Sequence, residues 1–264
     1  MSPFQAAVLG IVQGLTEFLP ISSSAHLYVI PTLLHWPYAG VAFDVALHWG
    51  TLLALLAAFG GTFVRLGRDA VAGTGAESAG ARRLLAKLVV ASVPAAIAGL
   101  LLQDAADTLL RHLPLQAAML AVFGFLLWWV DRVRPSTVHG DEPGWGTCIL
   151  VGAAQALALV PGVSRSGVTI TAGRAAGLDR VSAARFSFLL ATPITFGAGL
   201  LELRHLPHPL PVVPLAIGVA CAAVTGFLAI RGLIAWLGRA GFGVFFAYRL
   251  AFAAVILVAI GRAR

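Results

Sequence analysis

Long apolar segments, separated by short polar stretches, set the pattern of the 264-residue chain. Six of them cover residues 41–64, 84–102, 115–130, 186–203, 212–234 and 242–260. Because a helix needs roughly 20 apolar residues to cross the hydrocarbon core of a bilayer, each segment approaches or reaches the length of a membrane span. We therefore predict an all-α integral membrane protein with about six transmembrane helices, which form a single membrane domain over 1–264.

Two other apolar stretches, 4–35 and 147–175, are interrupted by proline and by serine-rich turns. Residues 10–26 read GIVQGLTEFLPISSSAH, and residues 152–169 read GAAQALALVPGVSRSGVT. Both have a Gly-x-x-Gln start, an apolar run, a proline and a serine-rich turn, which indicates a weak internal repeat. Non-helical backbone at membrane depth is tolerated only where protein or a water-filled cavity surrounds it. We therefore predict two re-entrant helical hairpins whose turns meet at a central cavity.

The two hairpins divide the chain into a first repeat, residues 1–134, and a second repeat, residues 147–264. A further pair of similar segments, at 88–102 and 188–202, follows the two hairpins at comparable distances. Each half then holds one hairpin and three spans, and an odd number of crossings inverts the second half relative to the first. The expected fold is therefore an inverted-topology repeat.

Charged residues make up only 11% of the chain, against roughly 25% in a typical soluble domain, and the net charge is +7. The basic residues are scattered over short loops and form no single soluble face, so we expect no nucleic-acid partner. Twelve lie in 65–87, 131–146, 174–185 and 231–241, all on one side of six spans, and four lie on the other side. The positive-inside rule then predicts a multi-pass protein of the cell (inner) membrane with both termini outside. The Gly-, Ala- and Ser-rich stretch 67–80 is expected to be a flexible cytoplasmic loop.

Gln13 and Glu17 are the first candidates for chemistry. Their i, i+4 spacing puts both side chains on one face of the first half-helix. An acidic residue at mid-membrane costs ~3 kcal/mol, so it usually faces a cavity, a cation or a partner. Glu17 could form a structural ion pair with Arg165 or Arg249, or act as a general base. It could also bind a hard divalent cation, with Gln13 supplying a second oxygen.

The residues after Pro20 bring hydroxyl groups into the first turn of the second half-helix. Free backbone N–H groups and the helix dipole favour an anion at that end. One of Ser22, Ser23 and Ser24 is expected to cap the helix. A serine or His26 could act as nucleophile or acid/base there, or His26 could be a buried histidine with ordinary hydrogen bonds.

The sequence PGVSRSGVT at 161–169 is the sharpest local signal, because it places glycine, hydroxyl groups and one arginine in an otherwise apolar region. Gly162 permits a close approach of the backbone, and Arg165 can bind two phosphate oxygens at once. Three hydroxyl groups add hydrogen-bond donors: Ser164, Ser166 and Thr169. The motif fits phosphate or another small oxyanion. The alternative is a packing turn in which Arg165 pairs with Glu17.

At these motifs the chain resembles the undecaprenyl-diphosphate phosphatase family of the bacitracin-resistance type. The similarity runs through 13–20, 22–26, 161–169, 186–193 and 247–249, and it covers essentially the whole chain. It implies hydrolysis of a polyprenyl diphosphate lipid, undecaprenyl diphosphate, to undecaprenyl phosphate and inorganic phosphate, which recycles the carrier lipid of cell-wall synthesis. It also implies bacitracin resistance, a divalent cation (Mg²⁺ or Ca²⁺) and a site that faces the periplasm or the cell exterior.

Residue by residue, the resemblance places the family's acidic motif on Gln13 and Glu17 and its Ser/His element on Ser23 and His26. Its phosphate-binding element falls on Ser164, Arg165 and Thr169. The first acidic position is often Glu in such proteins, so with Gln13 a two-carboxylate metal site does not follow. The implied catalytic residues are Glu17, Ser23, His26 and Arg165, and the expected metal ligands are Glu17 and Gln13.

The sequence is compatible with two catalytic routes, two functions and two assembly states. Ser23 can attack phosphorus, or a water activated at Glu17 can attack it, because both routes use the same residues. Inverted hairpins are also typical of secondary carriers, so transport of a lipid phosphate or another anion is the rival function. Small residues at 197–199 allow close helix approach within one chain or between two, which leaves a homodimer open.

Overall fold

The computed structural model describes residues 1–38, 40–108, 112–140, 142–202 and 212–262, and the regular elements in this part of the chain are helices. In chain order they are α1 (Pro3–Phe18), α2 (Ser23–Leu33), α3 (Val41–Ala72), α4 (Gly75–Thr108), α5 (Leu113–Val133), α6 (Trp145–Ala156), the 3-10 turn η1 (Leu157–Leu159), α7 (Arg165–Ala175), α8 (Arg180–Glu202), α9 (Val212–Leu237) and α10 (Gly243–Arg262). The protein is therefore an all-α membrane protein, as expected.

Six of these helices, α3, α4, α5, α8, α9 and α10, are long and apolar enough to cross a bilayer, which confirms the predicted number of spans. The prediction of a flexible loop over 67–80 is wrong, because α3 continues to Ala72 and α4 begins at Gly75. The tip is a tight turn in which Gly75 has a φ of +67°. The Arg82 guanidinium donates to the Ala70 carbonyl at 2.7 Å and so supplies a partner near the end of α3.

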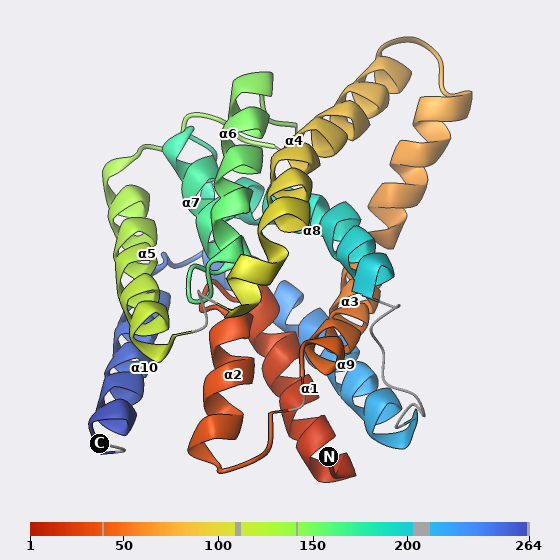
Figure 1. The fold of residues 1–264 in the computed structure, drawn as a ribbon. Coiled ribbons are helices and arrows are strands. Elements are labelled where there is room, and N and C mark those ends of the chain that lie inside the picture. Colours follow the sequence, from red (N-terminus) through yellow and green to blue (C-terminus); the bar gives the residue numbers. More distant parts are fainter. Residues whose placement is uncertain (39, 109–111, 141, 203–211, 263–264) are drawn as a thin grey trace.

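The two broken segments form short helical hairpins that enter from opposite sides (Figure 1). The pair α1 and α2 occupies the lower half of the view, and the pair α6 and α7 occupies the upper half, with both turns near mid-height. Both turns contain a serine in the left-handed region immediately before the second helix, Ser22 at φ +76° and Ser164 at φ +74°. A non-glycine residue rarely adopts this conformation, so the surrounding structure must hold both turns.

Each hairpin packs its first helix closely against a span of the other half. The helix α1 packs along α9, and α6 packs along α4. The contacts are too close for a side chain, because a Cβ at Gly14 would lie 2.6 Å from the Ala222 oxygen and one at Gly152 would lie 2.5 Å from the Ala91 oxygen. Each hairpin thus packs against the opposite half of the chain, which is the arrangement expected of an inverted repeat. The boundaries of the two repeats stay a prediction.

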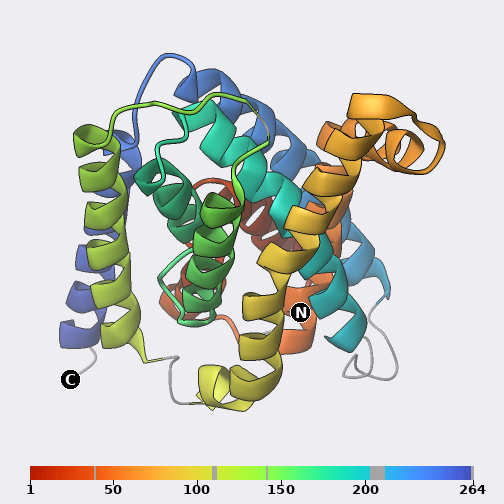
Figure 2. The same ribbon diagram turned by 90° about the horizontal axis from the view of Figure 1, so that it is seen from above.

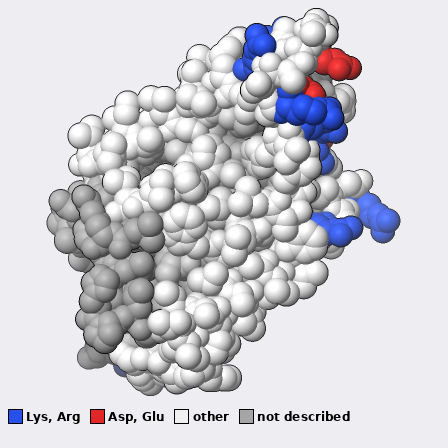
Figure 3. All heavy atoms as spheres, turned by 90° about the vertical axis from the view of Figure 1, so that its right-hand side faces the viewer, with Lys and Arg blue, Asp and Glu red and all other residues white. Residues whose placement is uncertain are grey.

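Seen from above, the hairpins lie inside a ring of spans (Figure 2). The helices α5 and α10 pack together on one side, and α3, α4, α8 and α9 lie on the other. The start of α1 and the end of α10 lie at the same, lower side of the molecule. On the face drawn in Figure 3, most basic side chains gather at the upper end, over the tip of α3 and α4. Four basic residues are expected on the opposite side of the membrane: Arg111, Arg204, Arg262 and Arg264. Of these, only Arg262 lies within the described residues.

Arg249 of α10 is fully buried and joins both hairpin turns. Its guanidinium donates to five backbone carbonyls: Nε to Leu120 at 2.8 Å, Nη1 to Pro20 at 3.2 Å, and Nη2 to Gly162 at 2.7 Å, Val163 at 3.1 Å and Met119 at 3.2 Å. Pro20 belongs to the first turn, Gly162 and Val163 to the second, and the other two carbonyls to α5. Carbonyl dipoles thus satisfy the buried cation, and the cation in turn satisfies backbone groups that the broken helices leave without partners.

We predict that Arg249→Met destabilises the protein by about 3 kcal/mol or more, because several buried carbonyls lose a charged donor at once. The measurement is the midpoint of thermal unfolding in detergent, with the exposed Arg239→Met as the control for loss of one arginine. Arg249→Lys should restore only part of the stability, since one ammonium cannot reach five acceptors. An unfolding midpoint equal to that of the wild type in Arg249→Met would contradict this role.

Candidate functional site

A cavity of about 220 Å³ lies between the two hairpin turns. The turns contribute Ser22, Ser23 and Ser24 from one side and Ser164 and Arg165 from the other. The spans contribute residues near the start of α3 (His48) and in the later parts of α4 (Ala95) and α8 (Thr195 and Ala198). These lining residues lie in the parts of the three helices that are nearer the chain termini, so the cavity is displaced toward that side of the molecule (Figure 1).

The carboxylate of Glu17 is the centre of the cavity's polar contacts, and its side chain is only 6% exposed. Arg165 Nη2 lies 2.7 Å from Oε1, and Ser23 Oγ donates to Oε2 at 2.5 Å. Gln13 Nε2 also donates to Oε2, at 3.1 Å, and His48 Nε2 lies 3.6 Å from the same oxygen. The ion pair of Glu17 with Arg165, open in the sequence, is therefore present, whereas Arg249 pairs with carbonyls instead.

Ser23 and His26, expected to act together, point to different surroundings. Ser23 begins α2 and contacts Glu17. The His26 ring is buried: its Nδ1 donates to the Ser22 carbonyl at 2.7 Å, its Nε2 lies 2.7 Å from the Tyr248 hydroxyl oxygen, and the ring stacks on Phe252 with centroids 4.1 Å apart. The structure thus brings Ser23 to Glu17 and directs the His26 ring toward α10. These contacts match the alternative of a hydrogen-bonded structural histidine.

The predicted phosphate-binding residues of the second turn separate into two groups. Ser164 and Arg165 line the cavity, where Arg165 Nη1 also donates to Thr195 Oγ1 at 3.1 Å. Ser164 additionally caps α7, because its Oγ accepts from the Gly167 N–H at 3.1 Å. The helix therefore begins beside Arg165, and its free N–H groups add to the positive potential there.

The other three residues of the motif make contacts inside the protein. Ser166 Oγ donates to the Leu19 carbonyl at 3.3 Å and so links the two turns. Thr169 Oγ1 bonds the Arg165 carbonyl and the Ser187 hydroxyl, both at 2.7 Å. Gly162 has a φ of +97°, and a Cβ on it would lie 2.6 Å from the Gln116 oxygen. These positions shape the turn, and their predicted contact with phosphate stays a prediction.

Three polar residues of the cavity are not among the predicted site residues: His48, Gln155 and Thr195. Gln155 was visible in the Gly-x-x-Gln match but was not treated as a site residue. Its side chain is buried, and neither Nε2 nor Oε1 has a hydrogen-bond partner among the described residues. Leaving such a group unsatisfied costs about 1–3 kcal/mol. For His48 and Thr195, helical spacing alone did not show which face of α3 or α8 reaches the cavity.

Few side chains of the cavity could act as ligands of a divalent cation. The described residues contain no group of three or more His, Cys, Asp or Glu side chains suited to a metal. Glu17 supplies one carboxylate, and Gln13 Oε1 is buried with no hydrogen-bond partner. Mg²⁺ is commonly held by one or two carboxylates together with substrate phosphates and water. The residues present therefore fit a cation that takes its other ligands from a phosphate substrate.

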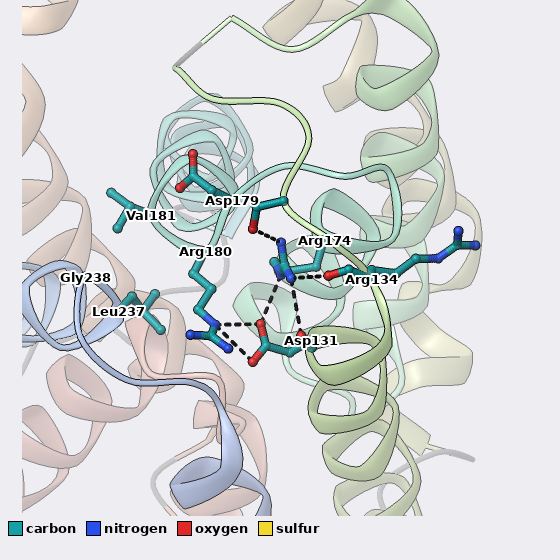
Figure 4. Close-up of a pocket in the computed structure, with 9 residues that line it drawn as sticks. Asp131, Arg134, Arg174, Asp179, Arg180, Val181, Leu237 and Gly238 are labelled. Atoms are coloured by element: carbon teal, nitrogen blue, oxygen red, sulfur yellow. Dashed lines mark hydrogen bonds and ion pairs between the residues drawn. The ribbon is translucent and has the colours of Figure 1, made fainter.

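A second cavity, of about 440 Å³, lies among α5, α7, α8 and the end of α9, near the ends of α5 and α9 and the start of α8 (Figure 4). Asp131 lies between two guanidinium groups there, with Arg174 Nε at 3.0 Å and Arg180 Nε at 2.8 Å. Arg174 is 2% exposed and also donates to Ser136 Oγ at 3.0 Å and to the carbonyls of Leu178, Asp131 and Arg134. These bonds join α5, α7 and α8, so we interpret this cluster as structural.

Asp179 at the edge of the second cavity caps α8. Its Oδ1 accepts from the Ser182 N–H at 2.9 Å, and its Oδ2 accepts from the Ser182 hydroxyl at 2.6 Å. Burial raises the pKa of this carboxyl group, but the bonds from Ser182 and His139 outweigh that effect and lower it. The carboxylate therefore stays ionised at neutral pH, as a helix cap requires.

We predict that Asp131→Asn lowers the stability of the protein by about 3–5 kcal/mol, because Arg174 is left buried without its carboxylate. Thermal unfolding in detergent measures the change. The matched control is Asp69→Asn at the exposed pair with Arg68, for which about 0–1 kcal/mol is expected. Equal effects of the two substitutions would mean that the Asp131 cluster does not hold α5, α7 and α8 together.

The fold and the first cavity define a class: a polytopic helical membrane protein with two broken hairpins that enclose a carboxylate, a guanidinium group and several hydroxyl groups. The chain belongs to the family of the bacitracin resistance protein BacA, whose sequence profile matches residues 6–255. This confirms the resemblance seen in the motifs.

Several curated relatives are similar over nearly their whole length, and each carries the name undecaprenyl-diphosphatase. The protein of Pelotomaculum thermopropionicum is 47% identical over 99% of this chain and 98% of its own. That of Moorella thermoacetica is 47% identical over 97% of both chains, and that of Thermomicrobium roseum is 46% identical over 100% of both.

Proposed function

We propose that this protein hydrolyses undecaprenyl diphosphate to undecaprenyl phosphate and inorganic phosphate in the cavity between its hairpin turns. The observation that carries the proposal is the hydrogen bond of 2.5 Å from Ser23 Oγ to a Glu17 carboxylate that is paired with Arg165. A hydroxyl group, a carboxylate base and a guanidinium cation thus meet in one cavity. The names of the relatives indicate the same reaction.

The terminal phosphate of the substrate would bind at Arg165. The guanidinium already faces the cavity beside the start of α7, where backbone N–H groups also favour an anion. Ser164 and Thr195 add hydroxyl groups next to it. Because Glu17 pairs with Arg165 in the free protein, phosphate would share or replace that contact, which releases Glu17 to act as a base.

In the first step that we propose, Glu17 accepts the proton of Ser23, and Ser23 Oγ attacks the terminal phosphorus. The bond between this phosphorus and the bridging oxygen breaks, and undecaprenyl phosphate leaves with the electron pair. Water then hydrolyses the phosphoserine and frees inorganic phosphate. The short bond between Ser23 and Glu17 favours this route over direct attack by water.

A divalent cation, Mg²⁺ or Ca²⁺, is part of the proposal. Glu17 and the unpartnered Oε1 of Gln13 would hold it together with substrate oxygens. When bound, such a cation offsets the charge of the diphosphate.

The site is proposed to face the periplasm or the cell exterior. The cavity lies toward the side of the termini, and the positive-inside rule assigns that side to the outside. Hydrolysis there would return carrier lipid to cell-wall synthesis and confer bacitracin resistance.

We predict that Arg165→Lys and Glu17→Gln each lower phosphate release from undecaprenyl diphosphate by about 10²-fold or more. Lysine keeps the charge but cannot bind two phosphate oxygens at once, and glutamine cannot accept the proton of Ser23. Release by purified protein in detergent is measured with Mg²⁺, with Ca²⁺ and with a chelator, and chelation should abolish it. Arg239→Lys serves as the control outside the cavity. A folded wild type that moves labelled lipid without releasing phosphate would support the carrier instead.

For Ser23→Ala we expect a loss of about 10³-fold or more in kcat, because the variant lacks the nucleophile. The neighbouring Ser24→Ala, which also lies at the cavity, should lose far less. With terminally labelled substrate, acid quenching should trap label on the wild-type chain and none on Ser23→Ala. Near-normal turnover of Ser23→Ala would establish attack by water activated at Glu17.

A further inference from the structure

Gln155 is a buried polar side chain of the cavity that has no role in the proposed reaction and no hydrogen-bond partner within the described part of the chain. It lies near the end of α6, is 2% exposed and lines the cavity that holds Glu17, Ser23 and Arg165. No described residue bonds its Nε2 or its Oε1. Buried amides in folded proteins nearly always have partners, so an amide kept without one beside a ligand cavity indicates that the ligand supplies them.

The other half of the chain shows what this glutamine lacks. Gln13 occupies the same place in the Gly-x-x-Gln motif, and its Nε2 donates to Glu17 Oε2 at 3.1 Å, four residues further on. The residue four positions after Gln155 is Leu159, which lines the same cavity and offers no acceptor. The second half thus keeps the glutamine without its carboxylate, and the buried amide beside the cavity is left without a partner among the described residues.

The two ends of the amide call for different partners. Nε2 carries two N–H donors and suits an anionic oxygen, whereas Oε1 accepts and needs a donor. A phosphate group at neutral pH offers mainly acceptors, so it can satisfy Nε2 and not Oε1. Water can donate to Oε1. A phosphate oxygen and a water molecule together would therefore satisfy both ends of Gln155.

We propose that Gln155 is a further catalytic residue of this site, which donates to an oxygen of the terminal phosphate and accepts a hydrogen bond from the attacking water. Glutamine amides orient water in this way in other phosphoryl-transfer sites. The inference rests on the proposed phosphatase activity and adds a residue to it.

In the hydrolysis of the phosphoserine, a bond forms between the water oxygen and phosphorus as the bond from phosphorus to Ser23 Oγ breaks. Glu17, protonated in the first step, returns its proton to Ser23 Oγ. Inorganic phosphate leaves with both protons of the water, and the carboxylate is regenerated. Gln155 exchanges no proton in this step and acts by holding the water in line with the bond that breaks.

The experiment compares Gln155→Met, which keeps the length of the side chain without its polar ends, with Ile149→Met on the exposed face of the same helix. Phosphate release, trapping of labelled phosphate on the chain and thermal unfolding are measured for both. We expect kcat of Gln155→Met to fall about 10²-fold, label to accumulate on the chain, and the unfolding midpoint to stay equal or rise, because two unsatisfied polar atoms are removed. Ile149→Met should match the wild type.

Gln155→Glu separates the two ends of the amide. It keeps an acceptor for water, loses the donor and adds a negative charge, so KM should rise more than kcat falls. Normal turnover of Gln155→Met beside an active wild type would overturn the role of Gln155 and leave the phosphatase intact. A lowered unfolding midpoint without trapped label would assign Gln155 to structure alone. An inactive, folded wild type would overturn both proposals.

Discussion

The need to satisfy backbone polar groups at membrane depth determines the rest of this structure. Two pairs of helices break in the middle of the protein, and each break leaves carbonyl and N–H groups that lipid cannot satisfy. Arg249 supplies donors to both turns, and Ser166 donates from one turn to the Leu19 carbonyl of the other. The turns are thus fixed to one another, and without that connection no cavity of defined shape would exist between them.

Fixing the turns also places the polar side chains. Ser22 and Ser164 hold left-handed conformations directly before α2 and α7, so both helices begin at the cavity and direct their N–H groups toward it. Glu17 lies at the end of α1, one residue before the helix ends at Phe18. The strained backbone, the two helix starts and the position of the carboxylate therefore all follow from the same pair of interruptions. This explains why the candidate catalytic side chains lie where the helices are broken.

The sequence predicts the spans and the hairpins, and it offers the pairing of Glu17 with Arg165 as one of several alternatives, because apolar length and the cost of intramembrane charge are properties of local sequence. It does not predict the extension of α3 to Ala72, because glycine and serine suggested a loop where alanine and the bond from Arg82 support helix. It also does not separate Ser23 from His26. Both lie in the first turn of α2, and only the packing of α10 shows that the histidine ring hydrogen-bonds to Tyr248 and stacks on Phe252.

The charge of the cavity argues for a cation during turnover. Glu17 and Arg165 cancel one another in the free protein, and their pairing keeps both charges stable in surroundings of low polarity. A diphosphate brings several negative charges, which one arginine and two helix starts cannot offset at depth. A divalent ion entering with the substrate would restore the balance, and Gln13 Oε1 offers it a neutral ligand. Because Gln13 is neutral, the site does not place two carboxylates against one arginine.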